Sequence, residues 1–311
     1  MAASSSLNSG SEVPTAAWEI DLSRLQINDF VKQGSQGTLF CGKYDGRDVA
    51  VKLLEWGRDG HSTPEQIICL GESLRELAAA WDEMDHPNIA KFIGAFIGKS
   101  PPPDTTSFVL TERLNGGTLR EYLDKHTKCK LNYKNAVNLA LGMARGLSYL
   151  HSRQIVHHNV RTENMLLDDN VNIKIADFGV SCIDSDPKDM TGRTGTSCYK
   201  APEVLDGKPY NHKCDVYSFG ICLWEIYCCA NFIDVTSAAL HNQLRPKIPK
   251  CCPQDMARIM RMCWDVEPAS RPEMHEVVGM LEKLNTKKGH GMVPAGQPSG
   301  CSCFSIKHHF S

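Results

Sequence analysis

The amino-terminal third of the chain alternates apolar and polar residues in short segments, a pattern typical of paired β-strands. Alternation from residue 29 to 51 is interrupted by Asp45-Gly46, a residue pair that favours a two-residue hairpin turn. Two further strand-like segments, 91–98 and 107–111, flank a Pro-rich loop. These patterns predict a small set of antiparallel strands.

Helical spacing of apolar residues appears once within this region, at 64–84, and dominates after residue 117, at 118–125 and 133–152. The last of these segments is expected to be a buried helix because of its apolar set, which is Val137, Leu139, Leu141, Leu147 and Leu150. The larger, carboxyl-terminal part is therefore expected to be mainly helical.

Length and composition place the chain among ordinary globular proteins. It has 311 residues, enough for one two-part domain or two smaller ones, with 41% hydrophobic and 23% charged residues. A net charge of −2 gives no electrostatic reason to expect nucleic acid or an anionic membrane as a partner. No apolar run approaches the length of a membrane span, and the first residues lack the apolar core of a signal peptide, so we expect a cytoplasmic protein.

Fourteen cysteines would suggest disulfides in a small secreted chain, but this length and amino terminus favour free thiols in a reducing compartment. The adjacent pairs at 228–229 and 251–252 lack the spacing of zinc ligands, so small core side chains are the better interpretation. Cys301 and Cys303 lie in a Gly/Pro/Ser-rich tail. Membrane contact is expected only if these two are lipidated, and a loose tail is the favoured interpretation.

Candidate chemistry is concentrated between residues 155 and 181. An apolar approach leads to a polar loop, a short alternating strand at 171–175, and then Asp177-Phe178-Gly179. Loop, strand and Asp-Phe-Gly at this spacing resemble the catalytic-loop and metal-loop pair of eukaryotic protein kinases.

Gly34 and Gly37 form a second motif, between the first two expected strands. Glycine there would let backbone N–H groups approach phosphate oxygens without a Cβ in the way. The full kinase pattern has three glycines, and its first position is Lys32 here. Alone, a glycine turn in a hairpin is the commoner meaning, but Lys52 follows at the distance expected of a phosphate-contacting lysine.

Residues 18 to about 304 resemble the short plant Raf-like MAP kinase kinase kinases. The resemblance rests on WEIDLSRL, YDGRDVAVKLLEWGRDG, DHPNIAKFIGA, NGGTLREYL, APEVLDGKPYN and CDVYSFGICLWEIYCC, in this order. It implies an α+β, bilobal protein kinase fold with a small antiparallel β lobe, one regulatory helix and a larger, mainly α lobe. The implied boundaries are a tail at 1–24, a kinase domain at 25–285 (lobes 25–114 and 115–285) and a flexible tail at 286–311.

The resemblance also implies ligands, partners and site residues. ATP and Mg²⁺ are the expected ligands, and other proteins of a cytoplasmic kinase cascade are the expected partners. Expected ATP contacts are Gly34, Gly37, Leu39, Ala50, Lys52, Thr111, Glu112, Leu114 and Leu166; expected metal ligands are Asn164 and Asp177. Glu203 and Arg271 are expected to form a buried ion pair, and 221–228 a buried central helix.

The main departure from the family is His157-His158-Asn159, which stands where the family has His-Arg-Asp. Asn159 can accept a hydrogen bond from a substrate hydroxyl, but it cannot take the proton or supply negative charge. Arg161 replaces the lysine that follows, keeping the charge in a larger planar group. His157 is expected to pack inward, and His158 to point towards the activation segment, mostly uncharged.

A second departure concerns the helix at 64–84. The position expected to hold the glutamate that pairs with Lys52 is Leu77, and Glu76 lies one residue, about 100°, around the helix. Either the helix is locally shifted so that Glu76 substitutes, or the ion pair is missing, which we favour.

Three interpretations remain open at this point. The chain could be a pseudokinase that binds ATP and protein partners, a slow serine/threonine kinase, or a scaffold that binds no nucleotide.

Overall fold

The computed structural model describes residues 16–34, 37–55, 63–98, 106–176, 178, 198–232 and 245–286. The chain divides into two compact units. The first contains the described residues up to Asp82 together with Phe92–Thr111, and the second contains Glu83–Lys91 and the described residues from Glu112 onward. The short segment Glu83–Lys91 therefore leaves the first unit and belongs to the second.

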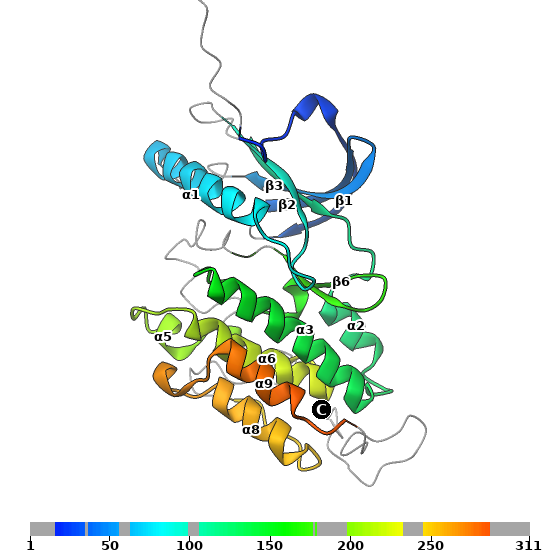
Figure 1. Ribbon diagram of the computed structural model, residues 1–311, viewed down its shortest axis with the longest axis vertical. Coiled ribbons are helices and arrows are strands. Elements are labelled where there is room, and N and C mark those ends of the chain that lie inside the picture. Colours follow the sequence, from blue (N-terminus) through cyan, green and yellow to red (C-terminus); the bar gives the residue numbers. More distant parts are fainter. Residues whose placement is uncertain are drawn as a thin grey trace, which may run out of the picture. The chain divides into compact units, whose positions relative to one another are not determined.

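The first unit is a five-stranded sheet in the order β1-β2-β3-β5-β4, with helix α1 packed against β4 (Figure 1). The elements are β1 (Leu25–Gly34), β2 (Gly37–Tyr44), β3 (Arg47–Glu55), α1 (Pro64–Asp82), β4 (Phe92–Ile97) and β5 (Thr106–Glu112), preceded by a 3-10 turn at Leu22–Arg24. Antiparallel pairing of β1 with β2, β2 with β3, and β4 with β5 confirms the expected strand arrangement.

The hairpin between β2 and β3 turns at the predicted residues. Tyr44 pairs with Arg47, and the two residues between them, Asp45 and Gly46, have φ angles of 50° and 74°. Two consecutive positive φ angles give the turn a twist that matches that of the strands. Aspartate tolerates this region better than most residues, and glycine adopts it without strain.

The segment before β1 also joins the sheet. Ala95 of β4 donates its N–H to the carbonyl of Trp18 and accepts from the N–H of Ile20, both at 3.0 Å. Gly94 permits this approach, because a Cβ there would lie 2.7 Å from the Trp18 carbonyl oxygen. Ile20 is thereby buried in one core cluster with Val49, Val51 and Leu110.

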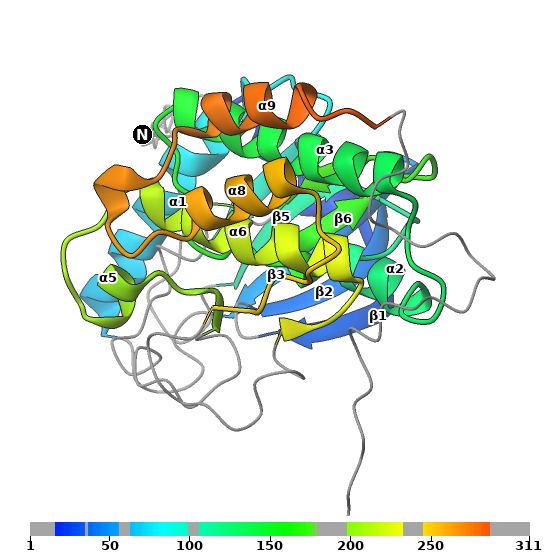
Figure 2. The same ribbon diagram turned by 90° about the horizontal axis from the view of Figure 1, so that it is seen from below.

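The second unit is mainly helical. Its elements are α2 (Leu119–Lys125), α3 (Tyr133–Ser152), β6 (Met165–Leu167), β7 (Ile173–Ile175), α5 (Pro202–Leu205), α6 (Lys213–Cys228), α8 (Gln254–Cys263) and α9 (Met274–Glu282), with 3-10 turns at Thr162–Asn164 and Pro268–Ser270. Helix α6 packs against α3 and α8, and α9 packs against α3 (Figures 1 and 2). The two units together make an α+β fold, as expected.

Three details refine the expected elements of this unit. Helix α3 has the predicted bounds, but Leu141 is only half-buried. The strand expected at 171–175 begins at Ile173, because Val171, with φ 62°, lies in the turn between β6 and β7. The described helices include none that is long and apolar enough to cross a membrane.

Helix α6 is the buried centre of the second unit. Every residue from Cys214 to Cys228 is buried, so the predicted central helix is confirmed and begins earlier than expected, at Lys213. Two acidic residues, Asp215 and Glu225, lie within this apolar helix. Because buried carboxylates are costly unless hydrogen-bonded, both residues need polar partners close to the helix.

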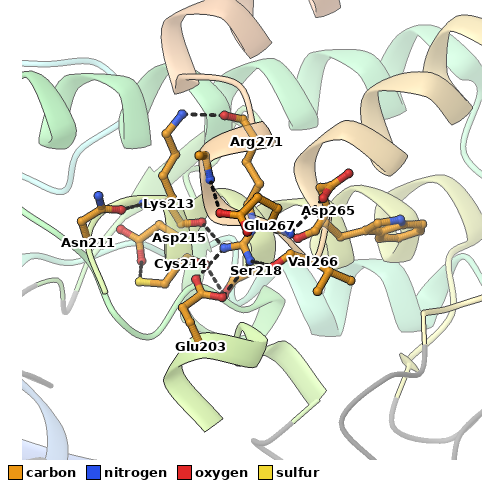
Figure 3. A network of polar contacts seen from close by, with 12 residues as sticks. Glu203, Asn211, Lys213, Cys214, Asp215, Ser218, Asp265, Val266, Glu267 and Arg271 are labelled. Atoms are coloured by element: carbon orange, nitrogen blue, oxygen red, sulfur yellow. Dashed lines mark hydrogen bonds and ion pairs between the residues drawn. The ribbon is translucent and has the colours of Figure 1, made fainter. Parts of the chain in front are cut away.

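The expected ion pair between Glu203 and Arg271 is confirmed. Arg271 donates from Nη1 and Nη2 to the two carboxylate oxygens at 2.6 and 2.8 Å (Figure 3). Its Nε donates to the carbonyl of Asp265 at 2.8 Å and Nη1 also donates to the carbonyl of Lys213 at 2.9 Å. The pair therefore joins α5 to the start of α6 and to the segment before α9.

We expect Glu203→Ala to lower the free energy of unfolding by about 3–5 kcal/mol, because it leaves the Arg271 charge buried without its counter-ion. The matched control is Glu282→Ala, which breaks the Arg145–Glu282 pair, where both side chains are 49% exposed. That change should cost at most about 1 kcal/mol. Urea unfolding followed by fluorescence measures both, and equal costs would contradict the structural role of Glu203.

Candidate functional site

The polar loop between α3 and β6 is held by the carboxylate of Asp215. Its Oδ2 accepts the backbone N–H of His157 at 2.7 Å, and its Oδ1 accepts that of His158 at 2.9 Å. His151, near the end of α3, places Nε2 3.0 Å from Oδ2. Burial raises the pKa of the Asp215 carboxyl, but the hydrogen bond and charge of His151 and the contacts of His157 outweigh it and leave that pKa below its ordinary value.

These contacts fix an unusual backbone conformation. His158 has a φ of 65°, a region that residues other than glycine adopt rarely. The hydrogen bonds that Asp215 makes to two consecutive N–H groups offset this strain. His157 is fully buried and its Nδ1 accepts the N–H of Asn159 at 3.4 Å, so its predicted inward packing is confirmed.

Asn159 takes part in the loop through its main chain. Its N–H donates to His157, and its carbonyl accepts Nδ2 of Asn164 at 2.9 Å. The side-chain amide of Asn159 makes no hydrogen bond within the described part of the chain. Loop geometry therefore does not depend on which group stands at the end of this side chain.

Arg161 is a fixed cation two residues further along. Its Nε donates to Oε2 of Glu163 at 3.0 Å, and its guanidinium lies over the ring of Tyr199, 5.7 Å from the ring centre. Burial lowers the pKa of Arg161, but the hydrogen bond and charge of Glu163 outweigh this and raise it above the ordinary value.

The second buried acid of α6, Glu225, holds the other end of the loop. Its Oε2 accepts the hydroxyl of Thr162 at 2.8 Å, and its Oε1 accepts the hydroxyl of Tyr199 at 2.9 Å and the N–H of Phe232 at 2.8 Å. Arg120 lies 3.7 Å from the same oxygen. Burial raises the pKa of Glu225, which these contacts lower only in part. One carboxylate thus joins the loop to the segments on both sides of α6.

His158 has an aromatic neighbour among the described residues. Its ring lies edge-to-face with Tyr210, with ring centres 5.6 Å apart. Residues 180–197 of the activation segment, towards which His158 was expected to point, lie outside the described residues, so that orientation stays a prediction. Burial lowers the pKa of His158 below its ordinary value of 6.5, so the ring is neutral at pH 7.

In the first unit, Gly34 pairs with Gly37 across the tip of the β1–β2 hairpin. Gly37 has a φ of 116°, and a Cβ there would collide with the carbonyl of Leu53 in β3. Gly34 has room, because the nearest atom to an added Cβ would be 3.8 Å away. A glycine at position 37 is therefore required by the close approach of β3 to the start of β2.

Register brings three of the predicted nucleotide contacts to one face of the sheet. Leu39 lies opposite Lys52, and Ala50 lies two residues before Lys52 on the same strand. Leu39 and Ala50 are half-buried, whereas Val49 and Val51, on the opposite face, are buried. The Lys52 side chain is mostly buried, at 9% exposure.

Glu112 has a structural role that the sequence did not reveal. Its Oε1 accepts the N–H of Lys91 at 2.8 Å and Nζ of Lys174 at 2.9 Å. The residue therefore ties β7 to the segment before β4 within the second unit. Thr111, Leu114 and Leu166, the other expected contacts nearby, are half-buried.

Helix α1 carries the second departure. Glu76 is exposed and forms no ion pair with any residue in the described ranges, and Leu77 is half-buried. This arrangement favours a missing ion pair over a locally shifted helix.

Several predicted positions lie outside the described residues. These are Asp177 and Gly179, the expected activation segment from 180 to 197, the Pro-rich loop at 101–103, and Cys301 and Cys303 in the tail. Phe178 is described and is fully buried.

Comparison with known proteins identifies the family of the chain. The family described as protein tyrosine and serine/threonine kinase matches residues 25–281. The chain belongs to this protein kinase family.

Several curated kinases are similar over most of the chain. Serine/threonine/tyrosine-protein kinase HT1 of Arabidopsis thaliana is 34% identical over 274 residues, covering 86% of this chain and 68% of the relative. Serine/threonine-protein kinase STY17 of the same plant is 34% identical over 290 residues, covering 89% and 48%. A putative serine/threonine-protein kinase/receptor, R831, of Acanthamoeba polyphaga mimivirus is 36% identical over 281 residues, covering 88% of this chain but 16% of the relative. The chain thus spans about half of the second relative and less of the third.

Proteins of the kinase family use ATP and Mg²⁺ and act on proteins.

Sequence reasoning missed Asp215 and Glu225 as the anchors of the loop. A signal was present, because these two are the only charged residues between Cys214 and Cys229. An acid within an otherwise uncharged helix needs internal partners, and a polar loop nearby can supply them.

The neutral, half-buried His158 predicts a pH effect on stability. Between its lowered native pKa and 6.5, the unfolded chain binds a proton that the native chain does not, so stability falls as pH drops below about 6.5. His158→Asn removes this titration and keeps a residue that tolerates positive φ. We expect a flatter dependence of urea unfolding on pH between about pH 5 and 7. The exposed His275, changed to Asn, controls for the loss of one histidine; an unchanged slope in the His158 variant would contradict the assignment.

Proposed function

We propose that this chain is an ATP-binding signalling protein of the plant Raf-like MAP kinase kinase kinase type whose phosphoryl transfer is lost or strongly impaired. The observation that carries the proposal is Asn159, an amide at the position of the proton acceptor, in a loop that Asp215 and Glu225 still hold. We propose further that it acts in the cytoplasm, through protein partners in a kinase cascade.

An amide in place of the carboxylate would impair phosphoryl transfer and leave the backbone conformation of the loop unchanged. An amide can align a substrate hydroxyl but cannot remove its proton. A general base contributes typically about 10²–10⁴-fold to a rate. Strong impairment with a residual rate is therefore the expected result.

Retention of nucleotide is supported by the residues that remain. Lys52, Leu39 and Ala50 share one face of the sheet. We propose that they contact ATP together with the other expected residues, which are Gly34, Gly37, Thr111, Glu112, Leu114 and Leu166. Asn164 uses its side-chain N–H on the carbonyl of Asn159, so its Oδ1 is the atom suited to Mg²⁺, with Asp177 as the second ligand. Bound Mg²⁺ would neutralise charge on the phosphates.

The alternative is an active but slow serine/threonine kinase. Arg161 supports it, because a fixed, fully charged guanidinium beside Asn159 could stabilise charge on a transferred phosphoryl group. The exposed Glu76 supports a third possibility, a scaffold without nucleotide.

Restoring the carboxylate separates the first two possibilities. We expect Asn159→Asp to raise radiolabelled phosphate transfer from ATP to a generic protein substrate by about 10²–10⁴-fold over the unchanged chain. The matched control is Asn170→Asp, which adds the same charge on an exposed turn and should leave transfer unchanged.

An unchanged chain that turns over at about 1–100 s⁻¹, as ordinary kinases do, would contradict the proposed impairment. Failure of the Asn159→Asp variant to gain activity would place the defect elsewhere, with Leu77 as the first position to change.

Nucleotide binding is tested by thermal unfolding. ATP should raise the unfolding temperature, with stabilisation of about 2.7 kcal/mol at a ligand concentration 100 times Kd. Lys52→Met should abolish the shift, whereas Lys43→Met, at an exposed position of β2, should preserve it. No shift in the unchanged chain, with or without Mg²⁺, would contradict ATP binding and favour the scaffold.

A further inference from the structure

Lys32 lies on the same face of the sheet as Lys52, although the two residues belong to different strands. Lys32 of β1 pairs with Leu39 of β2, and Leu39 pairs with Lys52 of β3. Residues that pair across neighbouring strands project their side chains from the same face of a sheet. The strands lie side by side in the order β1-β2-β3 (Figure 2), so the three side chains form one row. Two strand spacings place the Cα atoms of the two lysines about 10 Å apart.

An irregularity in β1 gives Lys32 this orientation. Phe30 pairs with Phe40, and Lys32 pairs with Leu39, so β1 has one residue more than β2 between these pairs. Phe40 packs against the core cluster on the opposite face of the sheet. Because side chains alternate along a strand, a regular β1 would turn residue 32 to the face of Phe30. The extra residue turns it to the face of Lys52 instead, as bulges do next to functional sites.

The row carries positive charge at both ends and an apolar side chain between them. Lys32 is exposed and forms no ion pair with a residue that the structure describes. Asp48, an acid on the same face, lies four residues along β3 from Lys52 and is paired with Lys43, with 3.9 Å between Oδ1 and Nζ. Two cations on one face, separated by a leucine, are complementary to a ligand with several negative charges.

We propose that Lys32 is a second phosphate-binding lysine, which contacts the phosphate oxygens of the nucleotide together with Lys52. This assignment rests on the proposed binding of ATP to this face of the sheet. Lys32 occupies the first position of the glycine pattern, so the departure from that pattern adds a positive charge beside the Gly34–Gly37 hairpin. Lys32 is not among the described residues with positive φ, so lysine adopts this backbone without strain.

The chemistry of lysine suits this position. Its ammonium group offers three N–H donors on a flexible stem, so it can follow phosphate oxygens from an exposed strand without a fixed geometry. The contact depends on phosphate charge, so it strengthens the binding of ATP and contributes nothing to the binding of adenosine. Salt should weaken the contact, because Lys32 is exposed to solvent.

Isothermal titration calorimetry of the full chain with ATP and with adenosine tests the proposal. Lys32→Met nearly keeps the length of the side chain and removes its charge. We expect the affinity for ATP to fall about tenfold and the affinity for adenosine to stay unchanged, because a hydrogen bond to a charged group has about this effect. Lys32→Arg keeps the charge and should retain most of the affinity for ATP.

The matched control is Lys43→Met, which removes the same charge from the same face. Lys43 lies four residues along β2 from Leu39, about 14 Å away, which exceeds the Debye length of about 8 Å at physiological ionic strength. The control should therefore bind ATP as the unchanged chain does. Raising the salt concentration should weaken ATP binding by the unchanged chain and the control more than by the Lys32→Met variant.

A Lys32→Met variant that binds ATP as tightly as the unchanged chain overturns this assignment and leaves the proposed ATP binding intact. Equal losses of affinity for ATP and for adenosine also overturn it, since they would indicate an altered site and not a lost phosphate contact. An equal loss in the Lys43→Met control does the same. An unchanged chain that binds no ATP overturns the proposed ATP binding together with this assignment, so the two failures are distinguishable.

Discussion

The buried carboxylate of Asp215 determines the shape of the loop that carries the predicted catalytic positions. It accepts two consecutive backbone N–H groups and lies in the first turn of α6, where the helix dipole favours negative charge. Without it, two N–H groups would be buried unsatisfied, and the positive φ of His158 would have no compensation. Glu225, at the other end of the same helix, completes the support through Thr162 and Tyr199.

This support does not involve the side chain of Asn159, the residue that we propose stands at the position of the catalytic carboxylate. Asn159 contributes only its N–H and carbonyl to the loop, and both contacts are independent of the side chain. An aspartate and an asparagine have nearly the same shape, so under the proposed assignment the exchange would remove a proton acceptor and leave the backbone conformation unchanged. Stability and chemistry are therefore separable at this position.

The sequence predicted what local patterns determine. The Asp45-Gly46 turn and the bounds of α3 follow from turn chemistry and periodicity, and the burial of α6 and the Glu203–Arg271 pair followed from family resemblance. Local patterns did not predict contacts between distant segments. Asp215 accepts backbone N–H groups about 57 residues away, and Gly37 is required by the carbonyl of Leu53 on β3. The uncharged residues around Asp215 indicate that it needs internal partners, but they do not indicate which segment supplies them. Roles assigned to Lys52, Asn164 and Asp177 in binding nucleotide stay predictions.

Trp18 and Ile20 pair with Ala95 on the outer side of the terminal strand β4. Both residues precede the matched family region, which begins at residue 25. A chain that started at that boundary would leave the N–H and carbonyl of Ala95 unpaired at the margin of the sheet and would open the cluster around Val49 to water. The structured part of this domain therefore begins at least seven residues before the start of the matched family region.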